Sequence, residues 1–125
     1  MSAMQRTKGA TAEREFCRLI RENLGDDVSR NLDQTREGGG DIVLRNMLIE
    51  VKHHKTPSIG QWWRQCVESA KRKGALPVLA YKINRKGWRV IVPMAEAWDT
   101  GHEWRESLEY TQELYLPGFW LYCRG

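Results

Sequence analysis

The chain has 125 residues, a formal net charge of +4 and six tryptophans. This length predicts one domain, residues 1–125, that buries about two-thirds of its unfolded surface. Three widely spaced cysteines without a C-x-x-C pair argue against a zinc site and favour a reducing compartment. Because no apolar run approaches membrane-spanning length, the sequence predicts a soluble cytoplasmic protein with no membrane partner.

The first half of the chain predicts one helix and three strands. Apolar residues recur at helical spacing from Thr11 to Leu24. Residues 27–31 are predicted to form a short strand, and residues 33–40 a polar loop. Asp41–Leu44 and Leu48–His53 are then expected to pair as a hairpin.

The second half predicts a helix within residues 57–74, opened by proline and serine and stopped by glycine. Pro77–Ile83 and Trp88–Val92 read as two further strands. The helical crossover predicts that the strands before and after it run parallel. We therefore expect an α/β fold with a mixed central β-sheet flanked by helices. The aromatic-rich residues 94–125 are expected to form a packed C-terminal extension or a subunit contact.

The triplet Glu50-Val51-Lys52 closes an otherwise apolar strand. Strand alternation places Glu50 and Lys52 on one face and Ile49 and Val51 on the other. Asp41 begins the preceding strand, directly after three glycines. Two carboxylates can hold Mg²⁺ through hard oxygen ligands, and a lysine beside the ion can orient an attacking water or stabilise a phosphate transition state. A surface ion pair would also explain the triplet if it stood alone.

Glu13 borders the apolar stripe of the first helix, because its neighbours on that face are Phe16, Cys17 and Ile20. A carboxylate beside a buried face must be paired or bound to a metal. The alternative is a first-turn glutamate that the helix dipole favours. Glu15 is predicted to lie on the solvated side of the same helix.

Other polar side chains are candidates for contacts to nucleic acid. Gln61 and Gln65 are i,i+4 neighbours opposite the core face of the second helix, where an amide can orient a water or a DNA phosphate or simply face solvent. His53 and His54 fall on opposite strand faces, and only His54 shares the face of Glu50. The basic candidates for phosphate contacts are Lys8, Arg30, Arg36, Lys55 and Arg64.

Taken together, Glu13, Asp41 and Glu50-Val51-Lys52 resemble the PD-(D/E)XK nuclease superfamily, although glycine precedes Asp41 where the family name has proline. The resemblance implies a restriction-endonuclease-like αβββαβ core. It also implies that Asp41, Glu50 and the main-chain carbonyl of Val51 ligate Mg²⁺, for which Mn²⁺ can substitute. Glu13 would complete the site directly or through water, and Lys52 would poise the nucleophile.

Longer stretches refine this resemblance. Residues 8–15 and 77–89 are similar to archaeal-type Holliday-junction resolvases, and residues 31–39 and 62–65 to small phage-encoded endonucleases. The resemblance covers residues 8–93 and leaves the extension without a counterpart. It implies a structure-selective DNA endonuclease, foremost a Holliday-junction resolvase, in the host cytoplasm if phage-encoded. Two symmetric nicks in a four-way junction imply a homodimer.

Three alternatives remain open. A nicking or general DNA endonuclease would have the same centre without junction preference. A catalytically dead DNA-binding protein could use the same scaffold, but Glu13, Asp41, Glu50 and Lys52 are all present. A restriction-type enzyme would need sequence-reading elements that 125 residues hardly accommodate. No small-molecule cofactor is expected.

Overall fold

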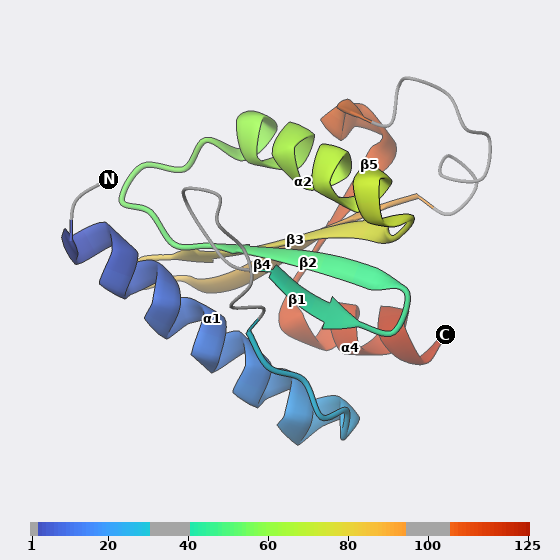
Figure 1. Cartoon of the computed structure of the whole chain (residues 1–125), viewed down its shortest axis with the longest axis horizontal. Coiled ribbons are helices and arrows are strands. Elements are labelled where there is room, and N and C mark those ends of the chain that lie inside the picture. The colour runs from blue at the N-terminus through green and yellow to red at the C-terminus, as the bar shows by residue number, and fades with distance from the viewer. Residues whose placement is uncertain (1–2, 31–40, 95–105) are drawn as a thin grey trace.

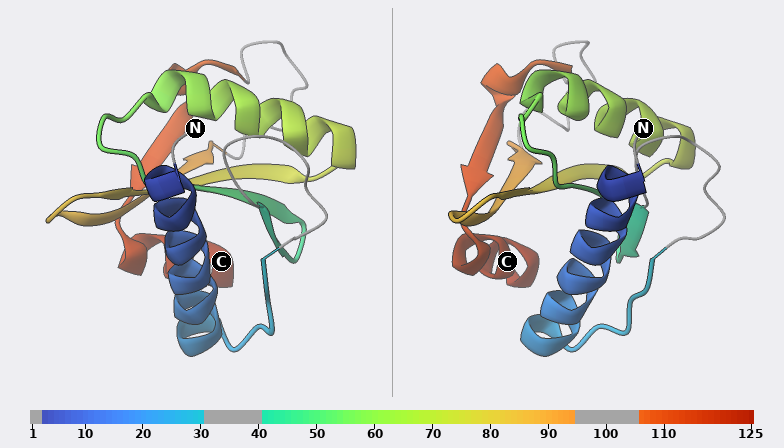
Figure 2. Two further views of the ribbon diagram at one scale, coloured as in Figure 1. Left: turned by 60° about the vertical axis from the view of Figure 1, so that its left-hand side comes forward. Right: turned by 90° about the vertical axis from the view of Figure 1, so that its left-hand side faces the viewer.

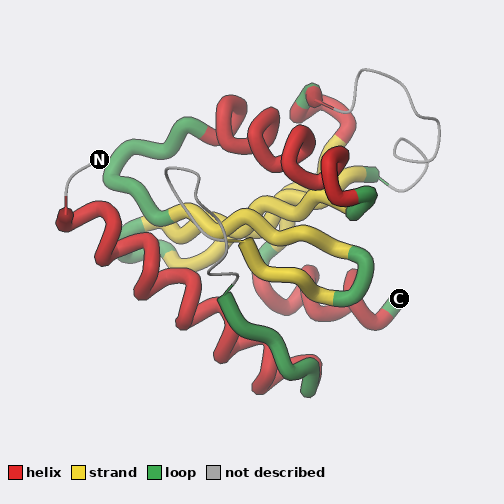
Figure 3. The backbone as a smooth tube through the Cα atoms, viewed as in Figure 1, coloured by secondary structure: helices red, strands yellow, loops and turns green. Residues whose placement is uncertain are grey.

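The computed structural model describes residues 3–30, 41–94 and 106–125. In these ranges the strands are β1 (Asp41–Leu44), β2 (Met47–Lys52), β3 (Leu76–Ile83), β4 (Gly87–Pro93) and β5 (Thr111–Leu114). The helices are α1 (Ala3–Leu24), α2 (Ile59–Lys73), the 3₁₀ helix η2 (Leu108–Tyr110) and α4 (Leu116–Arg124). Figure 3 distinguishes helices, strands and loops along the backbone.

The five strands form one sheet in the order β1-β2-β3-β4-β5. Strands β2 and β3 run parallel, whereas the other neighbouring pairs are antiparallel. Parallel neighbours need a long crossover, and α2 supplies it. The predictions of a mixed α/β sheet and of a parallel pair across the second helix are therefore confirmed.

Helices cover both faces of the sheet. Helix α2 lies on one face, and α1 and α4 lie on the other (Figures 1 and 2). On the α1 face, Ile49 and Val51 of β2 belong to the larger core cluster, together with Phe16 of α1. On the α2 face, Trp63 packs in a second cluster with Leu79 of β3. Burial on both faces explains why β2 is buried throughout its length.

Two predicted boundaries in the N-terminal part differ from the structure. Helix α1 begins at Ala3 and not at Thr11, because the preceding residues include good helix formers that need no apolar stripe to continue a helix. The strand predicted over residues 27–31 is wrong for the described residues 27–30, where only an isolated bridge joins Arg30 to Ile42. Aspartate and serine in this segment disfavour a longer strand.

The C-terminal residues are built into the sheet and the core. Strand β5 pairs with β4 at the edge of the sheet. Phe119 and Trp120 of α4 are buried in the larger cluster, with ring centroids each 6.1 Å from that of Phe16. The predicted packing of the aromatic extension is thus confirmed for Phe119, Trp120 and Tyr122, whereas Tyr110 and Tyr115 are exposed. Trp98 and Trp104 lie outside the described residues.

Among the described residues, no helix has the length and apolar character needed to cross a membrane.

Candidate active site

Glu50 and Lys52 lie side by side on the α2 face of β2. Their positions are opposite Leu79 and Tyr81 of β3, which belong to the α2 cluster. The Lys52 Nζ is 3.9 Å from the Glu50 Oε1, and the two residues are only 5 % and 3 % exposed. Strand alternation predicted this shared face. Burying two charges costs desolvation free energy unless they are paired and hydrogen-bonded. The fold therefore keeps the Glu50–Lys52 pair against an apolar cluster at a cost in stability.

Asp41 is the direct cross-strand partner of Glu50. Opposed residues of antiparallel strands have Cα atoms about 4.5–5.5 Å apart. The hairpin of β1 and β2 therefore brings together the backbone positions of the two predicted carboxylate ligands. The side chain of Asp41 and the whole of Arg36 lie outside the described residues.

Glu13 is buried on α1 and connects to the start of β1 through an arginine. The Arg30 Nε donates a hydrogen bond of 2.5 Å to the Glu13 Oε1, and Glu13 is 2 % exposed. Arg30 in turn bridges Ile42, which directly follows Asp41. Among the side chains that the structure describes, which do not include that of Asp41, no three histidine, cysteine, aspartate or glutamate residues gather as metal ligands.

An open cleft of about 490 Å³ is lined in part by Arg30, the partner of Glu13. Its described lining residues are Arg14, Cys17, Arg21, Ser29 and Arg30. The sequence analysis proposed only Arg30 from this group. The sequence contained a signal for three of the others, because Arg14, Cys17 and Arg21 are spaced at i, i+3 and i+7 and share one helix face.

The tryptophans of α2 face the core, and its glutamines face solvent. Trp62 and Trp63 are both buried. Gln61, Arg64 and Gln65 are exposed.

His54 contacts this aromatic layer, with its ring centroid 5.3 Å from that of Trp62. Burial and the nearby Lys52 ammonium lower the pKa of His54, which keeps its ring neutral near neutral pH. Burial lowers the pKa of His53, the hydrogen bond with Asn84 opposes this, and the positive charges of Lys8 and Lys82 lower the pKa further. Lys55 follows and is exposed.

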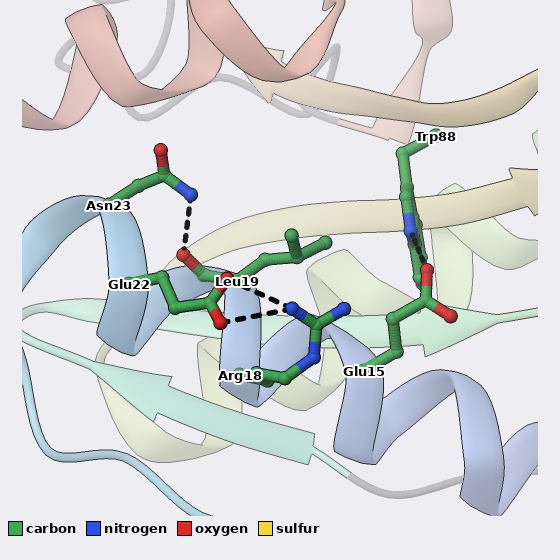
Figure 4. Close-up of polar contacts among 6 residues, drawn as sticks. All are labelled: Glu15, Arg18, Leu19, Glu22, Asn23 and Trp88. Atoms are coloured by element: carbon green, nitrogen blue, oxygen red, sulfur yellow. Dashed lines mark hydrogen bonds and ion pairs between the residues drawn. The ribbon is translucent and has the colours of Figure 1, made fainter.

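Glu15 is half-buried and paired, so its predicted position on the solvated side of the helix is wrong. Its carboxylate accepts hydrogen bonds from the Lys82 Nζ at 2.8 and 3.1 Å and from the Trp88 Nε1 at 2.8 Å. Figure 4 shows the contact with Trp88 and, farther along α1, the exposed pair of Arg18 and Glu22. Burial raises the pKa of Glu15, but the hydrogen bonds from Lys82 and Trp88 and the Lys82 charge outweigh it, so the pKa lies below its ordinary value of 4.5.

Replacing Glu15 by glutamine should lower the free energy of unfolding at pH 7 by about 1–2 kcal/mol. Because the folded-state pKa is depressed, this stabilisation is complete above the unfolded pKa and is lost as pH falls through the folded pKa. The difference between wild type and Glu15→Gln, measured by urea unfolding, should therefore shrink below about pH 4.5. Glu22→Gln, at the exposed pair, should change stability by less than about 0.5 kcal/mol at any pH. A difference that is constant with pH would contradict this assignment.

A mixed α/β sheet with Asp41 opposite a Glu50-Val51-Lys52 strand is the arrangement of a PD-(D/E)XK nuclease. Residues 4–115 match the family model described as "Phage putative PDDEXK endonuclease". The match spans most of the chain, so the chain belongs to this family. It extends beyond residue 93 and includes β5, so the family resemblance does not end where the sequence analysis placed it. Membership implies a nuclease with a DNA substrate, in a superfamily that generally uses divalent metals.

Proposed function

We propose that this chain is a Mg²⁺-dependent DNA endonuclease that cleaves branched DNA, and four-way junctions in particular. The observation that carries the proposal is the position of Asp41 opposite Glu50, with the Lys52 ammonium 3.9 Å from the Glu50 carboxylate. Asp41, Glu50 and the main-chain carbonyl of Val51 would hold the ion, and Mn²⁺ would substitute for it. Hard oxygen donors of this kind suit both metals.

The protein side chains have separate roles in this mechanism. A bound Mg²⁺ ion supplies a water of lowered pKa and neutralises charge on the scissile phosphate. The Lys52 ammonium is fixed by burial and by Glu50, so it orients the attacking water without reorganising. Glu13, which is paired with Arg30, would complete the site directly or through a water, as the family resemblance implies.

The proposed DNA contacts surround this centre. Arg30 would bind a phosphate in the cleft that it shares with Arg14 and Arg21, since three guanidinium groups favour an anion there. Gln61 and Gln65 are exposed on α2 and would bind or orient a phosphate near the attacking water. The remaining proposed phosphate contacts are Lys8, Arg36, Lys55 and Arg64.

Junction preference rests on the similarity of residues 8–15 to junction resolvases. Resolving a four-way junction requires two symmetric nicks, and a two-fold dimer presents two such centres. A nicking or general endonuclease with the same centre is the alternative, and it predicts equal cleavage of branched and linear DNA.

The test compares a labelled synthetic four-way junction with a linear duplex of the same sequence, in Mg²⁺ and in EDTA. We expect paired, symmetric cuts in the junction alone, and only with the metal. Equal cleavage of both substrates would overturn the junction assignment and leave the nuclease. Tight junction binding without any cleavage, in Mg²⁺ or Mn²⁺, would overturn the catalytic assignment in favour of a DNA-binding scaffold.

A further inference from the structure

The turn between β3 and β4 stands at the same end of the sheet as the carboxyl end of β2. Because β2 and β3 are parallel and in register as far as Lys52 and Tyr81, the end of β3 continues past the end of β2. The turn residues Asn84, Arg85 and Lys86 are exposed. Figure 2 shows this hairpin projecting beyond the helices.

The turn is held in place against the segment that follows the candidate active site. The His53 Nε2 lies 2.8 Å from the Asn84 Oδ1, which joins the residue after Lys52 to the first residue of the turn. The turn therefore lies directly beside the segment that follows Lys52.

The charge at this end of the sheet is mainly positive. The turn itself carries two exposed basic residues, Arg85 and Lys86, and the charge of Lys8 acts on the neighbouring His53. Two carboxylates in the vicinity are already paired, since Glu15 accepts hydrogen bonds from Lys82 and Glu113 accepts one from Tyr81. The exposed cations thus give the end of the sheet a surface suited to an anionic backbone.

Arg85 has an unusual backbone conformation for its residue type, with φ of 67°. This left-handed region favours glycine or asparagine and is strained for other side chains. Arg45 in the β1–β2 turn shares the conformation, with φ of 57°, but its side chain binds Asp26 and the Cys123 carbonyl. In the described part of the chain, no hydrogen bond or ion pair holds the side chain of Arg85.

We infer that the β3–β4 turn is a second DNA-backbone contact, in which Arg85 binds a phosphate on the flank of the cleaved position. The inference rests on the proposed function. Strand β3 extends two residues beyond Tyr81, the partner of Lys52, which is about 7 Å, and Arg85 lies in the turn that follows. At about 3.4 Å per nucleotide along one strand, and with the reach of the arginine side chain, the contacted phosphate lies about two to four nucleotides from the cut.

The test measures binding of an uncleaved junction in EDTA, as a function of salt, by Arg85→Gly, Arg85→Asn and Arg45→Gly. Both substitutions at Arg85 accept the left-handed conformation, so the fold should remain as stable as wild type or become more stable. We expect affinity to fall about fivefold or more and the salt slope to decrease by about one. Arg45→Gly removes the same charge from a turn at the opposite end of the sheet and should leave affinity unchanged.

A second measurement locates the contact. Single neutral methylphosphonates are placed along the DNA, and one that lies about two to four nucleotides from the cut should weaken binding by wild type but not by Arg85→Gly. Equal affinity of wild type and both Arg85 variants would overturn the inference, while cleavage by wild type would leave the proposed function standing. Absence of DNA binding by wild type would overturn both. An equal loss in Arg45→Gly and Arg85→Gly would overturn the assignment to this turn.

Discussion

Replacing Glu50 by glutamine should reduce metal-dependent DNA cleavage by about 10³-fold or more while leaving binding of the junction largely intact. Glutamine keeps the volume of a side chain that is 3 % exposed, so no cavity forms. It removes the charge that a divalent ion needs. Asp41→Asn should have the same effect, because Asp41 is the cross-strand partner of Glu50.

Metal binding gives a readout that does not depend on cleavage. A ligand present at 100 times its dissociation constant stabilises a protein by about 2.7 kcal/mol. Mg²⁺ should therefore raise the melting temperature of wild type, and this rise should be lost in Glu50→Gln. Glu68→Gln, on the exposed surface of α2, is the matched control and should retain both the rise and cleavage. Full cleavage by Glu50→Gln would remove Glu50 from the centre.

Replacing Lys52 by methionine should reduce cleavage by about 10²- to 10³-fold through a different route. Methionine fills the buried space of the lysine stem but removes the ammonium group 3.9 Å from Glu50. The Glu50 carboxylate would then be buried without that counter-charge, which destabilises the protein in the absence of metal. Mg²⁺ would supply the missing positive charge.

Lys52→Met should consequently lose cleavage but gain a larger Mg²⁺-induced rise in melting temperature than wild type. Differential scanning calorimetry in Mg²⁺ and in EDTA measures this directly. Lys71→Met, on the exposed surface of α2, removes the same charge and should behave as wild type. If Lys52→Met lost the metal-induced stabilisation together with cleavage, the lysine would be needed for metal binding and the assigned role would be wrong.

Together these variants separate two steps that a cleavage assay alone would merge. Glu50→Gln should lose both metal binding and cleavage, whereas Lys52→Met should lose only cleavage. The two steps can be separated because Glu50 and Lys52 lie on the same face of β2 but carry opposite charges.

The sequence by itself determined the features that depend on near neighbours in the chain. Strand alternation was enough to place Glu50 and Lys52 on one face, and the structure confirms it. The end of α2 was also predictable from the sequence, because Gly74 takes the left-handed conformation that ends the helix. The parallel pair followed from the length of the crossover.

The tertiary structure alone decided which distant residues meet. Glu13 pairs with Arg30, 17 residues away, and Glu15 is drawn inward by Lys82, 67 residues away. Helical spacing identifies the apolar face of α1. It does not indicate which polar side chains from other parts of the chain lie next to the edge of that face. The same reason explains β5 and α4: their edge pairing and buried aromatic rings depend on the finished sheet, which local periodicity does not specify.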